Sequence, residues 1–230
     1  MSLPSHGANA HQLYQRLNIP IPEMVIDFSE NVNPLGPPNF VREQWESYAN
    51  LITKYPDPYG EPFLSAAAMY HGVSLKQILI GNGAAEIFAS IAIRYQHKKV
   101  VIIHPTFSEY EATLRPYGAV IKEIIAISSL PMNEVLSAVE NADVLYICRP
   151  NNPTGYLVPL EEIIQIATAA KRHDCDLVLD EAFLDFIEEQ ESFIPYLSDF
   201  PNVIVVRSMT KMYAIPGLRL GYAVAGKATI

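Results

Sequence analysis

The chain has 230 residues, of which 50% are hydrophobic and 18% are charged, and its formal net charge is −9. This composition is typical of a folded chain with a full hydrophobic core and excludes the intrinsically disordered class. The sequence contains no cluster of Lys or Arg that would offset its net negative charge locally, so nucleic acid and anionic membrane surfaces are poor candidates as partners.

The N-terminal sequence, MSLPSHGANAHQ, lacks the basic region and apolar run of a signal peptide. No apolar run approaches the ~20 residues that span a bilayer. Cys148 and Cys175 form neither a CxxC pair nor a Cys/His cluster, which favours buried thiols over a disulfide framework or a zinc site. We therefore predict a cytoplasmic location, no membrane contact and no metal site.

The first 40 residues are rich in turn-forming residues, including prolines at positions 4, 20, 22, 34, 37 and 38. Asn31, Asn33 and Gly36 add to this turn chemistry. A segment of this length without regular structure is usually functional or lies across a partner. We expect residues 1–40 to form an irregular N-terminal arm and residues 41–230 to form one large domain.

From about residue 78 onward, short β-branched runs alternate with longer segments of helical composition. Strands are predicted at 76–81, 99–105, 119–127, 142–150, 175–182, 202–208 and 218–225. Helices are predicted at 84–96, 107–118, 131–141 and 159–174. This alternation predicts βαβ units in an α/β fold, with a mainly parallel sheet covered by helices on both faces as a three-layer αβα sandwich.

Polar or reactive residues follow successive predicted strands. They are Gly81-Asn82-Gly83, His104 to Phe107, Arg149 to Asn152, Asp180 to Phe183, and Ser208 to Lys211. In open α/β sheets, ligands bind outside the carboxyl ends of the strands. Any one polar loop means little, but the recurrence of such groups at one sheet edge predicts a binding site there.

Taken singly, these groups have structural as well as functional explanations. GNGAAE (81–86) fits either a plain strand-to-helix turn or a backbone cradle for phosphate at a helix N-terminus. RPNNPTG (149–155) fits either an ordinary turn or a loop that presents Asn152 to a ligand. Asp180 follows a buried strand, so its carboxylate needs a salt bridge, a helix cap or a cationic group of a ligand.

The sequence SMTK (208–211) allows two kinds of chemistry. Ser-x-x-Lys occurs in penicillin-binding enzymes, but these also need a later Ser/Tyr-x-Asn and a Lys-Thr-Gly. Here YAN (48–50) precedes SMTK, and no KTG exists. Alternatively, Lys211 is an amine that forms a Schiff base, in which case burial or a cationic neighbour should lower its pKa.

Together, the motifs resemble those of fold-type I pyridoxal-phosphate enzymes, the aspartate aminotransferase superfamily. The resemblance rests on the order NNPTG, DEAF, SMTK and GLRLGY, with Asp180 28 residues after Asn152 and Lys211 31 residues after Asp180. It covers about residues 6–225. It implies that residues 41–230 are the large cofactor-binding domain of a homodimer, and that the family's small C-terminal domain is absent from this chain.

The resemblance also implies a role for each matching residue. Lys211 would hold pyridoxal 5'-phosphate covalently and move a proton, and Asp180 would pair with the pyridine nitrogen. Asn152 would donate to the ring 3-oxygen, and Phe107 would stack on the ring. The residues implied for the phosphate are Gly83, Ala84, Ala85, Ser208, Arg219 and Tyr55 of the partner subunit.

Two branches of the superfamily fit the chain, the L-threonine-O-3-phosphate decarboxylases of cobalamin synthesis and the histidinol-phosphate aminotransferases. HGAN (6–9), the segment 26–38 and TKMYAIPGLRLGY (210–222) favour the decarboxylases. So does Phe183, where many of the aminotransferases have a tyrosine. The resemblance thus implies a small phosphorylated amino-acid substrate, and the third alternative is a non-catalytic relative. The residues expected at the substrate are His6, Gly7, Ala8, Asn9 and Asn31.

Overall fold

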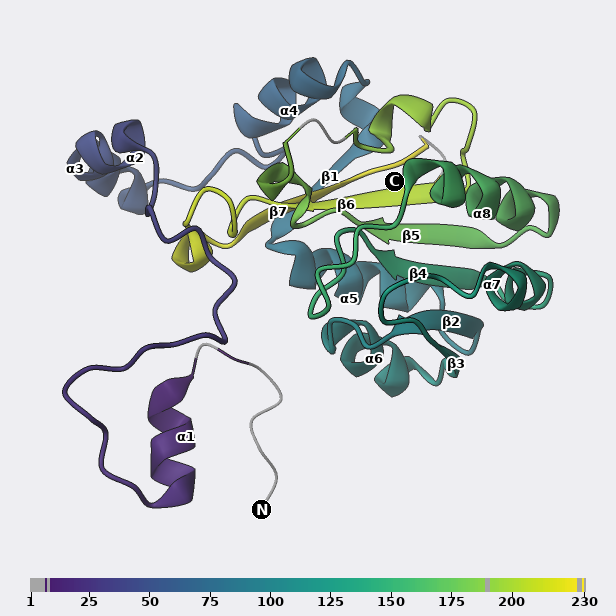
Figure 1. Cartoon of the computed structure of the whole chain (residues 1–230). Helices are drawn as coiled ribbons and strands as arrows, with labels where there is room; N and C mark the ends of the chain where they lie inside the picture. The colour runs from purple at the N-terminus through teal and green to yellow at the C-terminus, as the bar shows by residue number, and fades with distance from the viewer. Residues whose placement is uncertain (1–6, 8, 189–190, 227–228, 230) are drawn as a thin grey trace.

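The computed structural model describes residues 7, 9–188, 191–226 and 229 (Figure 1). Its centre is a seven-stranded sheet in the order β1-β7-β6-β5-β4-β2-β3. The strands are β1 (Ile78–Asn82), β2 (Lys99–His104), β3 (Val120–Ile125), β4 (Val144–Cys148), β5 (Asp176–Asp180), β6 (Val203–Ser208) and β7 (Leu220–Val224). Only β7 runs antiparallel to its neighbours, so the mainly parallel sheet is confirmed.

Helices cover both faces of this sheet (Figure 1). One face packs against α5 (Ala84–Arg94) and α6 (Glu109–Leu114). The other packs against α4 (Phe63–His71), α7 (Met132–Val139) and α8 (Leu160–Arg172). The strands are apolar on both sides because successive residues alternate between these two cores, which confirms the three-layer sandwich.

Among the described residues of the N-terminal arm, regular structure is limited to the start of α2 (Asn39–Glu43) and one complete helix, α1 (Ala10–Leu17), which lies apart from the sheet in Figure 1. The side chain of Asn9 caps its first turn by accepting from the Gln12 amide at 3.4 Å, and Asn18 ends it in the left-handed conformation. The prolines of the arm flank this segment but do not enter it, which is why a helix forms where an irregular chain was expected. The boundary at residue 40 stays a prediction.

The remaining elements are short. They are the helices α2 (Asn39–Glu43) and α3 (Trp45–Tyr48), and 3-10 turns at Ala49–Thr53, Leu75–Gln77, Arg115–Tyr117, Leu184–Phe186, Ile194–Tyr196 and Pro216–Leu218. None of the helices in the described part of the chain combines the length and the apolar character that crossing a membrane requires. Cys148 and Cys175 are both buried free thiols, as predicted.

The sheet topology gathers the polar strand ends at one edge. β2, β4, β5 and β6 are parallel, so their carboxyl ends lie on the same side. β7 is antiparallel to both β1 and β6, which places its first residues beside the ends of those strands: Leu220 pairs with Asn82, and Gly221 with Ser208. The turn before β7 therefore brings Arg219 to the same edge as Gly83 and Ser208.

Candidate functional site

A cavity of about 90 Å³ lies at this carboxyl edge of the sheet. The predicted residues that line it are Ala84, Ala85, Phe107, Asn152, Asp180, Ser208, Lys211 and Arg219. Residues from six separate sequence motifs thus meet around one small volume. The other lining residues are Phe88, Cys148, Ala182, Phe183 and Thr210.

One end of the cavity collects hydrogen-bond donors. Gly83 is the N-cap of α5, with φ of +80° and no side-chain cap, and a Cβ placed on it would lie 2.6 Å from the Arg219 guanidinium. Gly221 is required by close approach as well, because a Cβ there would lie 2.5 Å from the Ala84 amide nitrogen. The hydroxyls of Ser208 and Thr210 are 2.8 Å apart beside them. Amides at a helix N-terminus, a guanidinium and two hydroxyls form a set suited to a phosphate group.

Lys211 lines the same cavity, where both Arg219 and Asp180 are near enough to act on its charge. Burial lowers the pKa of Lys211, the nearby Arg219 lowers it further, and Asp180 and Glu30 act in the opposite direction. This confirms the predicted lowering, with burial as the larger cause. The Nζ atom also lies 5.9 Å from the centre of the Phe183 ring. A lysine with a lowered pKa has more of the neutral amine that attacks a carbonyl carbon.

Asp180 forms the opposite wall and is only 4% exposed. Its Oδ2 accepts from the Tyr110 hydroxyl at 2.5 Å, and its Oδ1 accepts from the Ala182 amide at 2.9 Å. Of the residues that the structure describes, none forms an ion pair with it. Burial raises the pKa of Asp180 to about 6, against the lowering effect of the two hydrogen bonds. A buried carboxylate with only neutral donors is therefore available to pair with a cationic group of a ligand.

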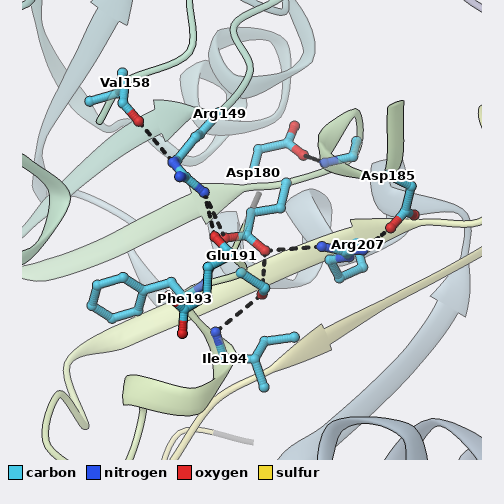
Figure 2. A network of polar contacts seen from close by, with 11 residues as sticks. Arg149, Val158, Asp180, Asp185, Glu191, Phe193, Ile194 and Arg207 are labelled. Atoms are coloured by element: carbon cyan, nitrogen blue, oxygen red, sulfur yellow. Dashed lines mark hydrogen bonds and ion pairs between the residues drawn. The ribbon is translucent and has the colours of Figure 1, made fainter. Parts of the chain in front are cut away.

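The next residue, Glu181, accepts from the amide of Phe193, whose side chain belongs to the core on the other face of the sheet, and it has a full set of partners. Figure 2 shows the polar network of this region. It is fully buried, and Arg207 lies 3.1 Å and Arg149 3.8 Å from its carboxylate oxygens. Ser192 donates a hydroxyl at 2.6 Å and Phe193 an amide at 2.9 Å. The salt bridge considered for the DEAF motif thus belongs to Glu181.

The two arginines around Glu181 extend this polar network. Arg149 and Arg207 contact different oxygens of the Glu181 carboxylate, and Figure 2 shows Asp185 paired to Arg207. Arg149 also donates to the carbonyl oxygens of Val158 and Glu191, each at 2.9 Å. Because Arg149 follows β4, Glu181 follows β5 and Arg207 lies in β6, the network joins the ends of three neighbouring strands.

A second cavity, of about 440 Å³, adjoins the first and shares Phe107, Asn152 and Lys211 with it. We call the first the inner cavity and the second the outer cavity. Gly7 and Asn31 line it, and the Asn31 side chain donates to the Asn152 side chain at 3.3 Å. The arm is fixed here by backbone contacts as well, since the amide of Asn33 donates to the Lys211 carbonyl at 3.1 Å. The arm therefore forms a wall of the space directly outside the lysine.

The structure does not bring all of the predicted residues to the two cavities. Asn9 caps α1 instead, and Tyr55 is fully exposed in this single chain. His6 and Ala8 lie outside the described residues. The roles suggested for these residues stay predictions.

Sequence reasoning missed several residues in or directly behind the wall of the inner cavity, and Tyr110, which lies behind the wall, contacts the site residue Asp180. Tyr110 follows Phe107 by three positions and precedes Leu114 by four, so it lies on the buried face of α6. A buried tyrosine usually finds a partner for its hydroxyl, and this pattern was the available signal. Cys148, Thr210 and Phe88 carried no comparable signal.

The donors and acceptors around the inner cavity fit pyridoxal phosphate. That molecule has an aldehyde, a phosphate, a phenolic oxygen and a basic ring nitrogen. The cavity offers the Lys211 amine, the cradle between Gly83 and Arg219, the Asn152 amide and the Asp180 carboxylate. Each group of the cofactor thus has a chemically suited side chain or cradle in one volume.

A mainly parallel sheet with a lysine, a buried aspartate and an anion cradle at its carboxyl edge defines a fold-type I domain. The family described as aminotransferase class I and II matches residues 23–230, and the chain belongs to this family. The family predicted from the motifs is confirmed. The Ser-x-x-Lys reading of residues 208–211 as a penicillin-binding motif is not supported.

Known proteins agree with this assignment. A threonine-phosphate decarboxylase from Salmonella typhimurium is 38% identical over 225 residues, which are 96% of this chain and 61% of the relative. An adenosylcobalamin biosynthesis bifunctional protein from Leptospira interrogans is 32% identical over 98% of this chain and 26% of its own length. The crystal structure of histidinol-phosphate aminotransferase from Sinorhizobium meliloti with pyridoxal-5'-phosphate superposes with a TM-score of 0.85, at 28% identity, over 99% of this chain and 62% of that chain. The chain thus spans about three-fifths of the length of the first of these relatives.

Proposed function

We propose that the chain is part of a pyridoxal-phosphate-dependent enzyme that decarboxylates L-threonine O-3-phosphate in cobalamin biosynthesis. The observation that carries the proposal is the meeting of Lys211, Asp180 and the Gly83–Arg219 cradle around one cavity. The similarity to a threonine-phosphate decarboxylase and to a cobalamin biosynthesis protein supports this choice of reaction.

In this proposal the residues of the cavity divide the work. When bound, pyridoxal phosphate supplies an electron sink for the bond that breaks at the substrate's Cα. Lys211 provides the amine that holds the cofactor and then carries a proton. Asp180 keeps the ring nitrogen protonated, which strengthens the sink, while Phe107 and Asn152 fix the orientation of the ring. Ser208, Arg219 and the first amides of α5 hold the phosphate.

The choice of reaction depends on how the substrate carboxylate is held. The bond that lies perpendicular to the ring plane breaks, so orienting the Cα–CO₂⁻ bond there releases CO₂, whereas orienting Cα–H there begins transamination. Gly7 and Asn31 line the outer cavity, where the substrate's phosphate would lie. Aminotransfer on histidinol phosphate is the second candidate, supported by the structural similarity to an aminotransferase of that name.

We further propose a cytoplasmic homodimer in which Tyr55 reaches the partner's phosphate cradle. The support is a series of large apolar side chains that are exposed in the single chain within residues 40–70, the part of the sequence that contains Tyr55. They are Phe40, Trp45, Leu51, Ile52, Tyr55, Met69 and Tyr70. Covering this apolar surface would stabilise a dimer.

The cofactor is tested by titrating the protein with pyridoxal phosphate and recording the visible absorbance band that forms when its aldehyde joins a lysine. The band should appear in the wild type and be absent in Lys211→Ala. The reaction is tested by adding threonine phosphate without any keto acid. Release of CO₂ supports decarboxylation, and a strict requirement for 2-oxoglutarate would replace it with aminotransfer.

The shared site is tested by mixing two defective variants, Lys211→Ala and Tyr55→Ala. A mixed dimer has one site with both defects and one site with neither, so activity should return on mixing. No recovery in a sample shown to contain mixed dimers would rule out the contribution of Tyr55 from the partner.

A further inference from the structure

The hydroxyl of Tyr110 is the only side-chain donor to Asp180 among the described residues. Tyr110 is 1% exposed, and its ring is held by edge contacts with Phe88 at 4.8 Å and Phe107 at 5.7 Å between centroids. Its position is therefore set by the core packing of α6. The donor reaches Asp180 from an element separate from the strand that carries the carboxylate.

Two donors from different directions fix the orientation of the Asp180 carboxylate. The Ala182 amide occupies a site on Oδ1, and the Tyr110 hydroxyl occupies a site on Oδ2. A carboxylate oxygen has about two acceptor sites, so one site on each oxygen remains. With only the Ala182 amide, the carboxylate could turn about its last bond.

We propose that Tyr110 is a positioning residue that keeps the Asp180 carboxylate ionised and turned toward the cavity, where it pairs with the ring nitrogen of the cofactor. This role rests on the proposed function, because it requires a cationic ring in the inner cavity. Tyr110 itself lies behind Asp180 and is not among the residues that line that cavity.

The electrostatics of the pair agree with this direction of proton donation. Burial raises the pKa of Asp180, and the hydrogen bond from Tyr110 lowers it. Burial and the neighbouring carboxylate raise the pKa of Tyr110 well above its ordinary value, so the phenol keeps its proton. Tyr110 therefore donates to the ionised Asp180 carboxylate, and removing its hydroxyl favours the protonated form of Asp180.

The chain offers a matched control in Tyr146 of β4. Its ring packs against that of Tyr110 at 5.4 Å between centroids, and it is also 1% exposed. Its hydroxyl is buried without a hydrogen-bond partner among the described residues. Tyr146→Phe therefore removes the same atom from the same aromatic cluster without touching Asp180.

The test compares the binding of two ligands to the wild type, Tyr110→Phe and Tyr146→Phe. The ligands are pyridoxal phosphate and its 1-deaza analogue, in which a carbon replaces the ring nitrogen. A hydrogen bond to a charged group is worth about tenfold or more in affinity. We expect Tyr110→Phe to weaken pyridoxal phosphate about tenfold and to leave the analogue unchanged or slightly tighter, and Tyr146→Phe to change neither.

The outcomes separate this role from the proposed function. If the wild type forms no lysine-bound band with pyridoxal phosphate, the proposed function fails and this role fails with it. If the band forms but Tyr110→Phe weakens both ligands equally, or neither, the role of Tyr110 alone is overturned. A second measurement uses Asp180→Asn, in which Tyr110→Phe should no longer change the affinity for pyridoxal phosphate.

Discussion

Asp180 and Glu181 are neighbours at the end of β5, and both are buried, but their surroundings are opposite in kind. Asp180 faces α5 and α6 and has two neutral donors. Glu181 faces the other layer and has two arginines and two further donors. The alternation of side chains along an extended chain sends the two carboxylates to different layers, so one sequence motif serves two purposes.

The difference distinguishes a structural carboxylate from one prepared for a ligand. A buried charge is tolerated when it is paired and fully hydrogen-bonded, as Glu181 is. Burial raises the pKa of Asp180 and opposes its ionisation, and no described residue forms an ion pair that would offset this effect. A cationic ring nitrogen would supply that missing charge. Substituting Glu181 should therefore reduce stability more than function, whereas substituting Asp180 should reduce function more than stability.

The largest effect is expected for Glu181→Ala. It leaves Arg149 and Arg207 buried near each other without their shared carboxylate, and breaking a buried pair in this way costs about 3–5 kcal/mol. Urea or thermal unfolding would measure the loss. The matched control is Glu181→Gln, which keeps an amide of the same shape near Ser192 and should cost less. Equal unfolding midpoints for the wild type and Glu181→Ala would contradict the structural role of the network.

Asp180→Asn should show the reverse pattern. The substitution keeps the shape of the side chain but removes the negative charge proposed to pair with the ring nitrogen. We expect turnover to fall about 100-fold, which corresponds to about 2.7 kcal/mol in the barrier. Stability at neutral pH should stay the same or rise. A variant with wild-type turnover would remove Asp180 from the proposed site.

The pH dependence of stability should reveal the raised pKa of Asp180 in the cofactor-free protein. The ordinary value of 3.8 applies to the unfolded chain, and the folded value is about 6. Folding favours the protonated form of Asp180. The contribution of this carboxyl to the free energy of unfolding is therefore retained below pH 4 and lost as pH rises toward 6. The wild type should therefore lose about 2 kcal/mol relative to Asp180→Asn across this window. Parallel stability curves for the two proteins would show that burial does not perturb this carboxyl.

The smallest effect is expected at the edge of the network, for Asp185→Asn. The Asp185 side chain is 26% exposed, and Arg207 keeps its contact with Glu181 when Asp185 is neutralised. We expect a loss of about 1 kcal/mol, reduced by added salt because the pair is partly open to solvent. A loss as large as that of Glu181→Ala would mean that Asp185, rather than Glu181, is the main counter-charge.

Much of the fold could be predicted because its signals are local. Each predicted strand corresponds to an observed one, since β-branched apolar runs such as VVII (100–103) and VIVV (203–206) fit the interior of a sheet. The strand order was not predicted. β7 inserts antiparallel between β1 and β6, and its pairing with β1 joins residues more than 130 positions apart. Local patterns carry no information about such partners.

The candidate site likewise has residues that the sequence predicted and contacts that it did not. The family resemblance carried by the motifs predicted Lys211, Asp180, Asn152 and Arg219 as site residues, and the structure brings these four residues to one cavity. The partners of Asp180 and Glu181 were not identified. Tyr110 approaches from 70 positions away, and Arg207 from 26 positions away. Only the packing of α6 on the sheet and the register of β5 with β6 decide those contacts.

By itself, then, the sequence determined the family and the strands of the sheet, and it predicted the residues proposed to contact the cofactor, since these depend on residue type and local spacing. The tertiary structure alone decided which of two adjacent carboxylates, Asp180 or Glu181, lacks a counter-charge. The physical reason is that burial and charge pairing depend on what lies across each face of the sheet. Those neighbours come from distant parts of the chain.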